Sequence, residues 1–465
     1  MAVCSIAAVG LLVAAVVVAG DRGSGHPDAW DERVADLAAF VERERGLDFE
    51  HPVRVDFLTE AEYSEAARVD EGVLTDEDRE LLDESAAVLE ALGLVSARTD
   101  LLDLTNEMAD TGTLAYYDPI TETVTVRGTE MTTVLAATLV HEPTHVAQDQ
   151  AFDLERIVDD DESGSGEGLH ALVEGDAVRI EAAYVESLAA DEQDAYWDDY
   201  LGQVDDAEAG LDTVPAAMQA LFAAPYVLGD PFVALVAADG GNRAVDDAFA
   251  SPPASSEHLI DPGSFFADDA PVDVVDPDLP DGAERVGEPD VLGAVGLFVL
   301  LSERLDAEVA LVAADGWGGD RYAVFRDADR TCVRVALVAD TPGDLDEVAA
   351  ALRDWVAGGP AGAASVEVAG ETVALDSCAA GADAGEQPAG GASLDALTLP
   401  ATRAQLAVVG ATQVDLDRDG ALDFGACFVD RVPLDTLLQA NEAPDPPAEV
   451  TAAVADAMVG CTGGP

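Results

Sequence analysis

The chain contains 465 residues, and 94 acidic side chains against 22 basic ones give it a formal net charge of −72 at pH 7. A charge of this size, spread along the whole length, argues against nucleic acid or an anionic lipid surface as a partner. It is typical of a surface that stays hydrated in concentrated salt, as in a halophilic host, because salt screens the repulsion between like charges. The length allows two or three domains.

The N-terminal segment indicates where the protein resides. Residues 2–20 carry no charge and are rich in Ala, Val, Leu and Ile, and about 20 apolar residues suffice to span a bilayer as a helix. A signal peptide cleaved after Ala19 or Gly20 is the alternative. In both cases we expect the rest of the chain to lie outside the cytoplasm, either anchored to the membrane by residues 1–20 or secreted.

After this segment, the spacing of the apolar residues predicts helices and a strand. We expect an amphipathic helix from about Ala29 to Arg45, a strand at 53–58 and a helical region that continues to Leu92.

A β-hairpin is expected next, at 113–117 and 122–127, turned by an Asp-Pro pair, because apolar and polar residues alternate in its second half. Thr129 is then expected to cap a helix that begins with the apolar run 131–140.

This helix leads into the sequence His-Glu-Pro-Thr-His at residues 141–145. Residues four apart share one face of a helix, so His141 and His145 can present ring nitrogens to one metal ion, with Glu142 beside it. Pro143 departs from this pattern. A proline inside a helix removes a hydrogen bond and costs about 3 kcal/mol or more, and a kink there could misplace His145.

A catalytic zinc ion usually takes a third protein ligand, and Glu174 is the best candidate. It lies in a second predicted helix, 167–186, among apolar residues at helical spacing. A carboxylate in such surroundings is costly unless it is paired or bound to a metal. An acidic loop with Gly and Ser at 159–166 lets the chain reverse between the two helices.

These segments resemble the glutamate-ligand branch of the zincin metallopeptidases, the gluzincins, in which a His-Glu-x-x-His helix is followed by a second helix that supplies a glutamate. The resemblance implies that His141, His145 and Glu174 hold one zinc ion and that Glu142 is the general base. A looser likeness is to secreted, membrane-tethered bacterial proteins with such a domain. The segments that carry the closer likeness are 141–150 and 172–177, within residues 110–190, and the looser likeness extends through 252–262 and 316–322.

The activity implied is the hydrolysis of peptide bonds in a peptide or protein substrate, with Glu142 taking a proton from water and passing it to the leaving amine. Tyr184, Arg179 and His258 are polar groups that could stabilise the oxyanion, although an ordinary surface or hydrogen-bonded role is more common for each. A substrate in β conformation could add to strand 122–127 if that strand lies at the sheet edge.

Two further residues share a helical face with the candidate ligands. Asp149, four residues after His145, could accept a hydrogen bond from a ligand imidazole, act as an alternative third ligand, or lie in a solvated helix end. His170, four residues before Glu174, is a rival ligand.

Cysteine usage agrees with an oxidising compartment. Apart from one cysteine in the N-terminal segment, four lie in the last third of the chain. Three pairings are possible, and we favour Cys332 with Cys378 and Cys427 with Cys461, because a Gly/Ala-rich linker at 381–394 separates the two pairs.

The second half of the chain is predicted to form an α+β unit at 290–380 and a small helical module at 395–465. A Pro/Asp-rich stretch, 269–289, marks the boundary before the unit. The apolar run 291–305 is expected to be a helix, but its uncharged part is too short to span a membrane. The other elements expected here are strands at 322–325 and 332–338 and helices at 345–356 and 448–458.

A short acidic run near the C-terminus has the D-x-D-x-D-G spacing of a calcium-binding loop, which makes Ca²⁺ a second candidate ion. Ala426 stands where such loops carry a bidentate carboxylate, and the spacing arises easily by chance in so acidic a chain. The candidate ligands are Asp415, Asp417, Asp419 and Asp423.

The sequence thus predicts an α+β protein: a zincin-like domain at 28–270 whose active-site helix packs on a small sheet, then the smaller α+β unit, then a helical tail closed by a disulfide. The expected function is extracytoplasmic, zinc-dependent hydrolysis of peptide bonds. The alternative is an inactive zincin-like scaffold, in which Pro143 has abolished the chemistry and an extracellular binding or cell-envelope role remains.

Overall fold

The computed structural model describes most of the chain. The described residues are 25–96, 99–154, 166–211, 213–327, 330–379, 393–442 and 446–462. The predicted membrane segment, 1–20, lies outside them, as do most of the predicted linker at 381–394 and most of the predicted loop at 159–166.

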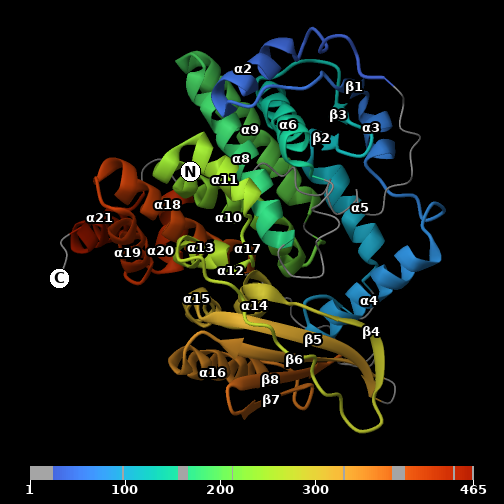
Figure 1. Cartoon of the computed structure of the whole chain (residues 1–465), viewed down its shortest axis with the longest axis vertical. Coiled ribbons are helices and arrows are strands. Elements are labelled where there is room, and N and C mark those ends of the chain that lie inside the picture. The colour runs from blue at the N-terminus through green and yellow to red at the C-terminus, as the bar shows by residue number, and fades with distance from the viewer. Residues whose placement is uncertain are drawn as a thin grey trace.

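The first half of the structure is a small sheet surrounded by helices (Figure 1). Its elements are α2 (Ala35–Arg45), β1 (Arg54–Leu58), α3 (Glu60–Ala66), α4 (Asp76–Leu92), α5 (Leu101–Gly112), β2 (Ala115–Asp118), β3 (Thr123–Arg127), α6 (Thr133–Phe152), α8 (Gly166–Ser187), α9 (Ala190–Gly210), α10 (Ala216–Gly240), α11 (Asn242–Ala250), α12 (Glu257–Ile260) and α13 (Pro262–Phe266). Helix α8 packs against both α6 and α10. The first predicted helix is shorter than expected, since it begins at Ala35 rather than at Ala29.

The small sheet has the strand order β1-β3-β2, with β1 parallel and β2 antiparallel to β3. The predicted hairpin is confirmed, because β2 and β3 pair along their whole length. Since β3 is the central strand, a substrate cannot add to residues 122–127 as considered above, and the edges of the sheet are β1 and β2. Val124 and Val126 share a buried apolar cluster with Leu135 and Leu139 of α6, so this helix covers one face of the sheet.

Helix α6 begins later than the sequence suggests. Thr132 is its cap and accepts a hydrogen bond from the N–H of Leu135, so the prediction of Thr129 as the cap is wrong. Met131 remains 41% exposed, whereas Val134 and Leu135 are buried. The helix therefore starts where its side chains begin to enter the core.

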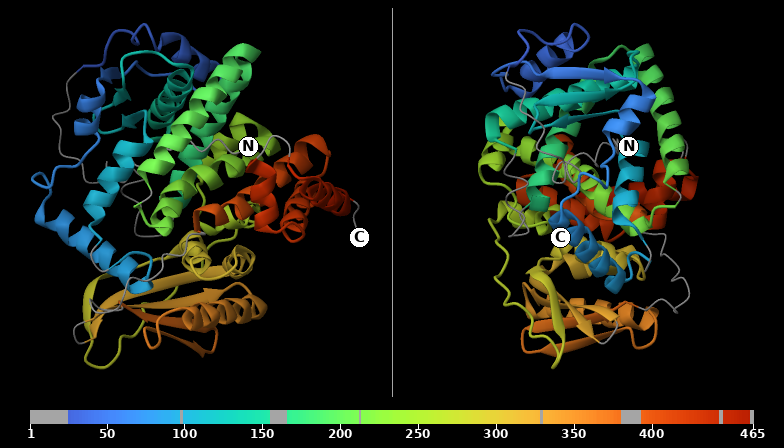
Figure 2. Two further views of the ribbon diagram at one scale, coloured as in Figure 1. Left: turned by 180° about the vertical axis from the view of Figure 1, so that it is seen from behind. Right: turned by 90° about the vertical axis from the view of Figure 1, so that its right-hand side faces the viewer.

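The second half of the structure is a five-stranded antiparallel sheet with helices against it and beside it (Figures 1 and 2). Its elements are β4 (Glu284–Asp290), α14 (Gly293–Ser302), α15 (Ala307–Asp315), β5 (Trp317–Asp327), β6 (Arg330–Ala339), α16 (Pro342–Gly358), β7 (Ala364–Ala369), β8 (Thr372–Cys378), α17 (Ser393–Ala396), α18 (Thr398–Gln413), α19 (Arg418–Val429), α20 (Leu434–Glu442) and α21 (Ala448–Thr462). The strand order is β4-β5-β6-β8-β7. Because β4 is an edge strand of this sheet, the predicted start of the unit at residue 290 is too late.

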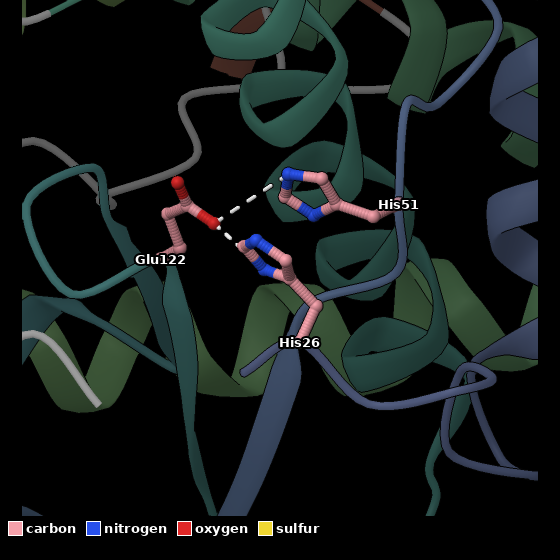
Figure 3. A group of neighbouring side chains, drawn as sticks. All are labelled: His26, His51 and Glu122. Carbon is pink, nitrogen blue, oxygen red and sulfur yellow. Dashed lines mark ion pairs between the residues drawn. The ribbon is translucent and has the colours of Figure 1, made fainter. Parts of the chain in front are cut away.

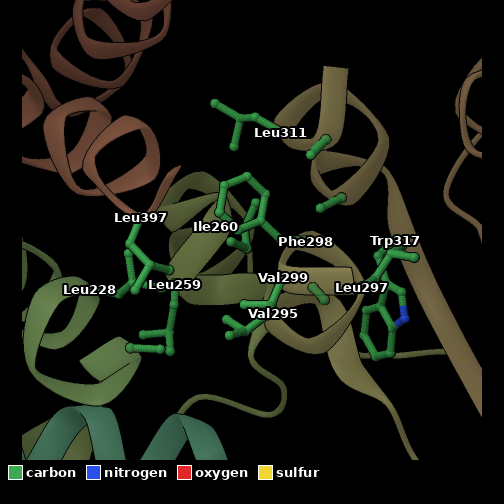
Figure 4. Packing of buried hydrophobic residues seen from close by; sticks show 14 of the residues in the cluster. Leu228, Leu259, Ile260, Val295, Leu297, Phe298, Val299, Leu311, Trp317 and Leu397 are labelled. Atoms are coloured by element: carbon green, nitrogen blue, oxygen red, sulfur yellow. The ribbon is translucent and has the colours of Figure 1, made fainter. Parts of the chain in front are cut away.

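One hydrophobic core joins parts that the sequence appeared to separate. It collects buried side chains from α8, α10, α12, the larger sheet and the C-terminal helices around α14. Figure 4 shows Ile260, Phe298 and Leu397 packed together in this core. All of α14 is buried, so the apolar run at 291–305 is a core helix.

Among the described residues, one helix is long and apolar enough to cross a membrane, and it is α10. It packs against α8 on one side and α18 on the other. These contacts make α10 a core helix of this fold, because its apolar surface is used by protein neighbours.

The run 316–322 has a structural role. Asp320 is buried and accepts hydrogen bonds of 2.7–2.9 Å from the backbone N–H groups of Leu292 and Gly293 and from Nε1 of Trp317. The first N–H groups of a helix lack partners within it. Asp320 therefore completes the N-terminus of α14 and ties that helix to β5.

Both predicted disulfides are present. Cys332–Cys378 joins facing positions of β6 and β8, and Cys427–Cys461 joins α19 to α21, which closes the helical tail as expected. Structural disulfides form and persist in oxidising compartments. They indicate an extracytoplasmic environment.

The predicted calcium-binding loop is not formed. Asp417 caps α19 by accepting a hydrogen bond of 3.0 Å from the N–H of Gly420. Asp419 and Asp423 consequently lie on a helix rather than in an encircling loop. With Asp415, they belong to none of the clusters of potential metal ligands found in the described part of the chain.

Candidate metal centre

Helices α6 and α8 bring the three predicted metal ligands together. Nε2 of His141 and Nε2 of His145 lie 3.2 Å and 3.3 Å from the same atom, Oε2 of Glu174. Their side chains are at most 10% exposed. Two neighbouring helices thus converge on one buried point, and the predicted second helix, now α8, supplies the carboxylate.

The other nitrogen of each imidazole is also engaged. Nδ1 of His141 lies 3.2 Å from Oε2 of Glu181, and Nδ1 of His145 lies 2.9 Å from Oε1 of Gln148. Carboxylate and amide oxygens accept hydrogen bonds, so we assign the hydrogen of both rings to Nδ1. Both Nε2 atoms then keep a lone pair, and both face Glu174.

The orientation of Gln148 is fixed by its own partners. Its Nε2 donates to the carbonyl of Val173 at 3.0 Å and to Oδ2 of Asp176 at 3.1 Å, which leaves Oε1 for His145. Asp176 is fully buried and pairs with the fully buried Arg45 at 2.5 Å. A chain of polar contacts that runs from Arg45 through Asp176 to Gln148 therefore holds the ring of His145 in place.

The spacing of the three ligand atoms fits a tetrahedral metal ion. Bonds of about 2.0–2.1 Å at tetrahedral angles separate neighbouring ligand atoms by about 3.3–3.4 Å, close to the 3.2 Å and 3.3 Å found between the histidines and Glu174. Three acceptor atoms facing one another in a buried site repel unless a cation or a proton lies between them. Two imidazoles and one carboxylate form a donor set that suits zinc.

The charges of the centre favour a cation. Burial opposes a charge on His141, but Glu174 and Glu181 outweigh it and raise the pKa of this histidine to about 10. Burial also opposes a charge on Glu174, yet the neighbouring histidines, His145 first, hold its pKa well below the usual range. Positive charge beside Glu174 is therefore stabilised, whether a proton or a metal ion carries it.

Glu142 lies next to this centre and is 2% exposed. Burial raises the pKa of its carboxyl group, and the nearby His141 and His145 partly oppose that rise. The backbone N–H of Tyr117, in β2, lies near this carboxyl group and favours its charged form. Glu142 is thus held between the ligand-bearing helix and the edge of the sheet.

On the edge of β2 that faces Glu142, two residues have backbone groups that do not pair with β3. The N–H of Arg127 donates to the carbonyl of Leu114, so these two residues form a hydrogen-bonded pair. Because such pairs alternate along antiparallel strands, the backbone groups of Ala115 and Tyr117 point away from β3. The proximity of the Tyr117 N–H to Glu142 agrees with this register.

Pro143 does not end the helix. Helix α6 continues through it to Phe152, and the rings of His141 and His145 have their centroids 4.6 Å apart. Both rings face Glu174, so the misplacement of His145 expected from a kink does not occur.

A close crossing of α8 and α10 adds a residue that the sequence did not reveal. A Cβ atom on Gly175 would overlap the backbone of Gly229, and one on Gly229 would overlap the carbonyl of Ala171. The absence of both side chains lets α10 approach until Tyr226, 4% exposed, lies near enough to Glu174 for the carboxylate to raise the pKa of the phenol further, beyond the effect of burial. In the sequence, the only sign of this role was the hydroxyl group of a tyrosine within an otherwise apolar helix.

His170 lies at the border of the centre. Its Nε2 is 3.4 Å from Oε1 of Glu174, and this nitrogen is buried and makes no hydrogen bond. Its ring centroid is 6.5 Å from that of Tyr226. His170, the alternative ligand suggested by the sequence, thus lies beside Oε1 of Glu174, whereas His141 and His145 lie beside Oε2.

Asp149 and Tyr184 have other partners. Asp149 accepts hydrogen bonds from the hydroxyl of Tyr117 at 2.8 Å and from the N–H of Leu154 at 2.9 Å, which places it at the C-terminal end of α6 rather than against a ligand ring. Tyr184 packs edge-on against Phe40, far along α8 from Glu174. Neither residue therefore supports a ligand or an oxyanion, and each has the ordinary structural role that the sequence left open for it.

His258 and Arg179 also do not face the centre. Nε2 of His258 lies 2.9 Å from the carbonyl of Asp269, in the region of α12. Arg179 donates to Asp176 and to Asn242, at 2.8 Å each. Each is held by partners away from the centre, so neither is an oxyanion donor.

Comparison with protein families matches one segment in the second half of the chain. Residues 284–414 match a family model described as a domain of unknown function (DUF8575). This match runs from β4 to the end of α18 and does not include the metal centre. No curated protein and no solved structure matches the chain.

Proposed function

We propose that the protein is an extracytoplasmic, zinc-dependent metallopeptidase of the zincin type. The observation that carries the proposal is the convergence of two imidazole nitrogens on one oxygen of Glu174, at 3.2 Å and 3.3 Å, with the carboxylate of Glu142 beside them. His141, His145 and Glu174 would hold the zinc. When bound, zinc supplies Lewis acidity, which polarises a carbonyl and makes water more acidic.

Glu142 would act as the general base. Its raised pKa brings its proton affinity closer to that of the groups it must serve near neutral pH. Its carboxylate would accept a proton from the attacking water and then pass it to the leaving amine. The nearby backbone N–H of Tyr117 favours the charged form of this carboxylate, the form that accepts a proton.

The edge of β2 would align the substrate. Ala115 and Tyr117 direct their backbone groups away from β3, and an extended peptide can pair with such an edge. A substrate strand there would lie beside Glu142. Peptide recognition would then depend mainly on backbone contacts, with side-chain preference set by neighbouring residues.

The variant Glu142→Gln tests the proposal. It keeps the shape of the side chain and leaves the ligands intact, so we expect metal content to be unchanged while hydrolysis of a quenched peptide library is lost. Glu186→Gln, an exposed change on α8 with the same loss of charge, is the control and should behave as wild type. Full activity in Glu142→Gln would refute its role as the base.

The alternative, a non-catalytic envelope protein stabilised by a metal, is favoured by one observation. The ligand side chains are at most 10% exposed, and His170 lies 3.4 Å from the other oxygen of Glu174, from which a small movement would bring it to the ion as a fourth protein ligand. A site with four protein ligands is typically structural. Loss of metal in His170→Ala, together with no peptide hydrolysis by the wild type, would support this alternative.

A further inference from the structure

A second group of histidines lies at the surface, at the turn between β2 and β3. Nδ1 of His26 is 3.1 Å and Nε2 of His51 is 3.8 Å from the same oxygen, Oε2 of Glu122. Figure 3 shows the two rings beside the Glu122 carboxylate, and they are stacked with their centroids 3.4 Å apart. One potential ligand atom from each residue lies within 4.8 Å of the others.

The carboxylate oxygen between the rings is unsatisfied. Oε2 of Glu122 has almost no exposed surface and makes no hydrogen bond, although Nδ1 of His26 is 3.1 Å away. A buried acceptor without a donor is costly. A cation between the carboxylate and the two ring nitrogens would remove that cost.

The position of Glu122 is fixed by its turn. Asp118 accepts hydrogen bonds from the backbone N–H of Ile120 at 2.9 Å and from the hydroxyl of Thr121 at 2.7 Å. Glu122 itself has a φ of 48°, which is uncommon for a residue with a side chain. The hairpin therefore presents this carboxylate in one orientation, as a preorganised ligand requires.

Histidine is rare in this chain, and its distribution is uneven. Of six histidines, His141, His145 and His170 gather around Glu174, and His26 and His51 gather around Glu122. A net charge of −72 attracts cations to the surface. Paired imidazoles then select zinc and similar ions over the alkali and alkaline-earth ions that carboxylates alone bind.

We propose that His26, His51 and Glu122 form a second binding site for a divalent ion of the zinc class, with water completing the coordination. Because the two rings are stacked, coordination by Nε2 of His51 requires that ring to turn toward the ion and to carry its hydrogen on Nδ1. Gln150 then gives up its 3.3 Å contact with Nδ1 of His51 and keeps its 3.0 Å bond to the carbonyl of that residue.

Such an ion would connect segments that are distant in the sequence. His26 comes from the first described residues, His51 from the segment before β1, and Glu122 from the turn beside β2. Gln150 of α6 already binds the backbone of Glu50 and His51. The site would fix the N-terminal segment to the hairpin that borders the buried centre, without taking part in the chemistry proposed for Glu142.

Zinc content of the full chain tests this site. Wild type, His26→Ala and Glu122→Gln are stripped with a chelator and dialysed against zinc in high salt, and bound zinc is counted per chain. We expect each variant to bind one zinc ion fewer than the wild type. Glu130→Gln removes one exposed negative charge from the loop before α6 and is the matched control, which should keep the wild-type count.

The outcome is independent of the proposed peptidase. If the buried centre also holds zinc, the count should fall from two to one, and if it does not, from one to zero. Hydrogen exchange in residues 25–34 should slow on adding zinc to the wild type but not to Glu122→Gln. An unchanged zinc count in both site variants would overturn the proposal.

Discussion

The carboxylate of Glu181 lies 3.2 Å from Nδ1 of His141, so the ring that faces Glu174 with one nitrogen is held by a second glutamate through the other. Both glutamates come from α8, two helical turns apart. A carboxylate behind a ligand histidine fixes the ring hydrogen and strengthens the nitrogen that binds metal.

Replacing this supporting carboxylate should weaken metal binding. We expect Glu181→Ala to lower zinc affinity about 10- to 100-fold, and Glu181→Gln to lower it less because the amide oxygen can still accept from Nδ1. Competition with a chromogenic chelator measures both constants. Equal affinities in Glu181→Ala and in the exposed control Glu186→Ala would show that Glu181 does not support the ligand.

The crossing of α8 and α10 should be sensitive to a single methyl group. Gly175→Ala would push its Cβ into the backbone of Gly229, and we expect a loss of stability of about 1–3 kcal/mol. Gly202→Ala is the control: its Cβ would meet nothing within 4 Å, so helix propensity alone predicts a gain of about 0.5–1 kcal/mol. Thermal unfolding in high salt compares the two, and similar Tm values would contradict the tight crossing.

The acidic group near α12 predicts an unusual dependence on pH. Burial, together with Asp340, Asp269 and Asp261, raises the pKa of Glu257 from 4.5 to about 8. The folded state then holds this proton more tightly than the unfolded state, so its contribution to stability is lost as pH rises from about 4.5 toward 8. Glutamine has no carboxyl group to ionise, so Glu257→Gln should not lose stability in this way as the pH rises.

We therefore expect the Tm of Glu257→Gln to rise relative to the wild type by a few degrees between pH 5 and pH 9. Thermal unfolding at a series of pH values, at constant high salt, checks this. Parallel curves for the two proteins would mean that Glu257 ionises normally in the folded state.

The net charge of −72 predicts a dependence on salt. At low ionic strength the screening length grows, and repulsion between carboxylates acts over longer distances. We expect the Tm to fall steadily as sodium chloride is removed, with sucrose at matched osmolality giving no protection of the same size. A Tm that is unchanged in dilute buffer would contradict an adaptation to salt.

The convergence of His141, His145 and Glu174 could be predicted from the sequence because its signals are local. His141 and His145 are fixed by one helical repeat, and Glu174 stood out as a charge in an apolar helix. The disulfide Cys332–Cys378 could likewise be anticipated from the linker that follows it, although the facing register of β6 and β8 explains it better.

What the sequence missed depends on contacts between distant elements. Tyr226 reaches Glu174 only because Gly175 and Gly229 let two helices touch. Asp149 has the right spacing for a ligand imidazole, yet Tyr117 of β2 binds its carboxylate. No helical repeat could reveal either contact.

The larger sheet was also only partly predicted. The hairpin of β7 and β8 turns at Gly370, with a φ of 67°, and its buried positions Val373, Leu375 and Ser377 alternate in β8. That alternation is a strand signal, but the short, alanine-rich segments around it carry little β propensity.

The most direct test of the account is the zinc content of the buried centre, measured in the Glu122→Gln background so that the surface site does not contribute. We predict about one zinc ion per chain, lost in His145→Ala together with hydrolysis of a quenched peptide library, as expected if His145 is a ligand of a catalytic zinc ion. A chain that binds no zinc at this centre would contradict the account.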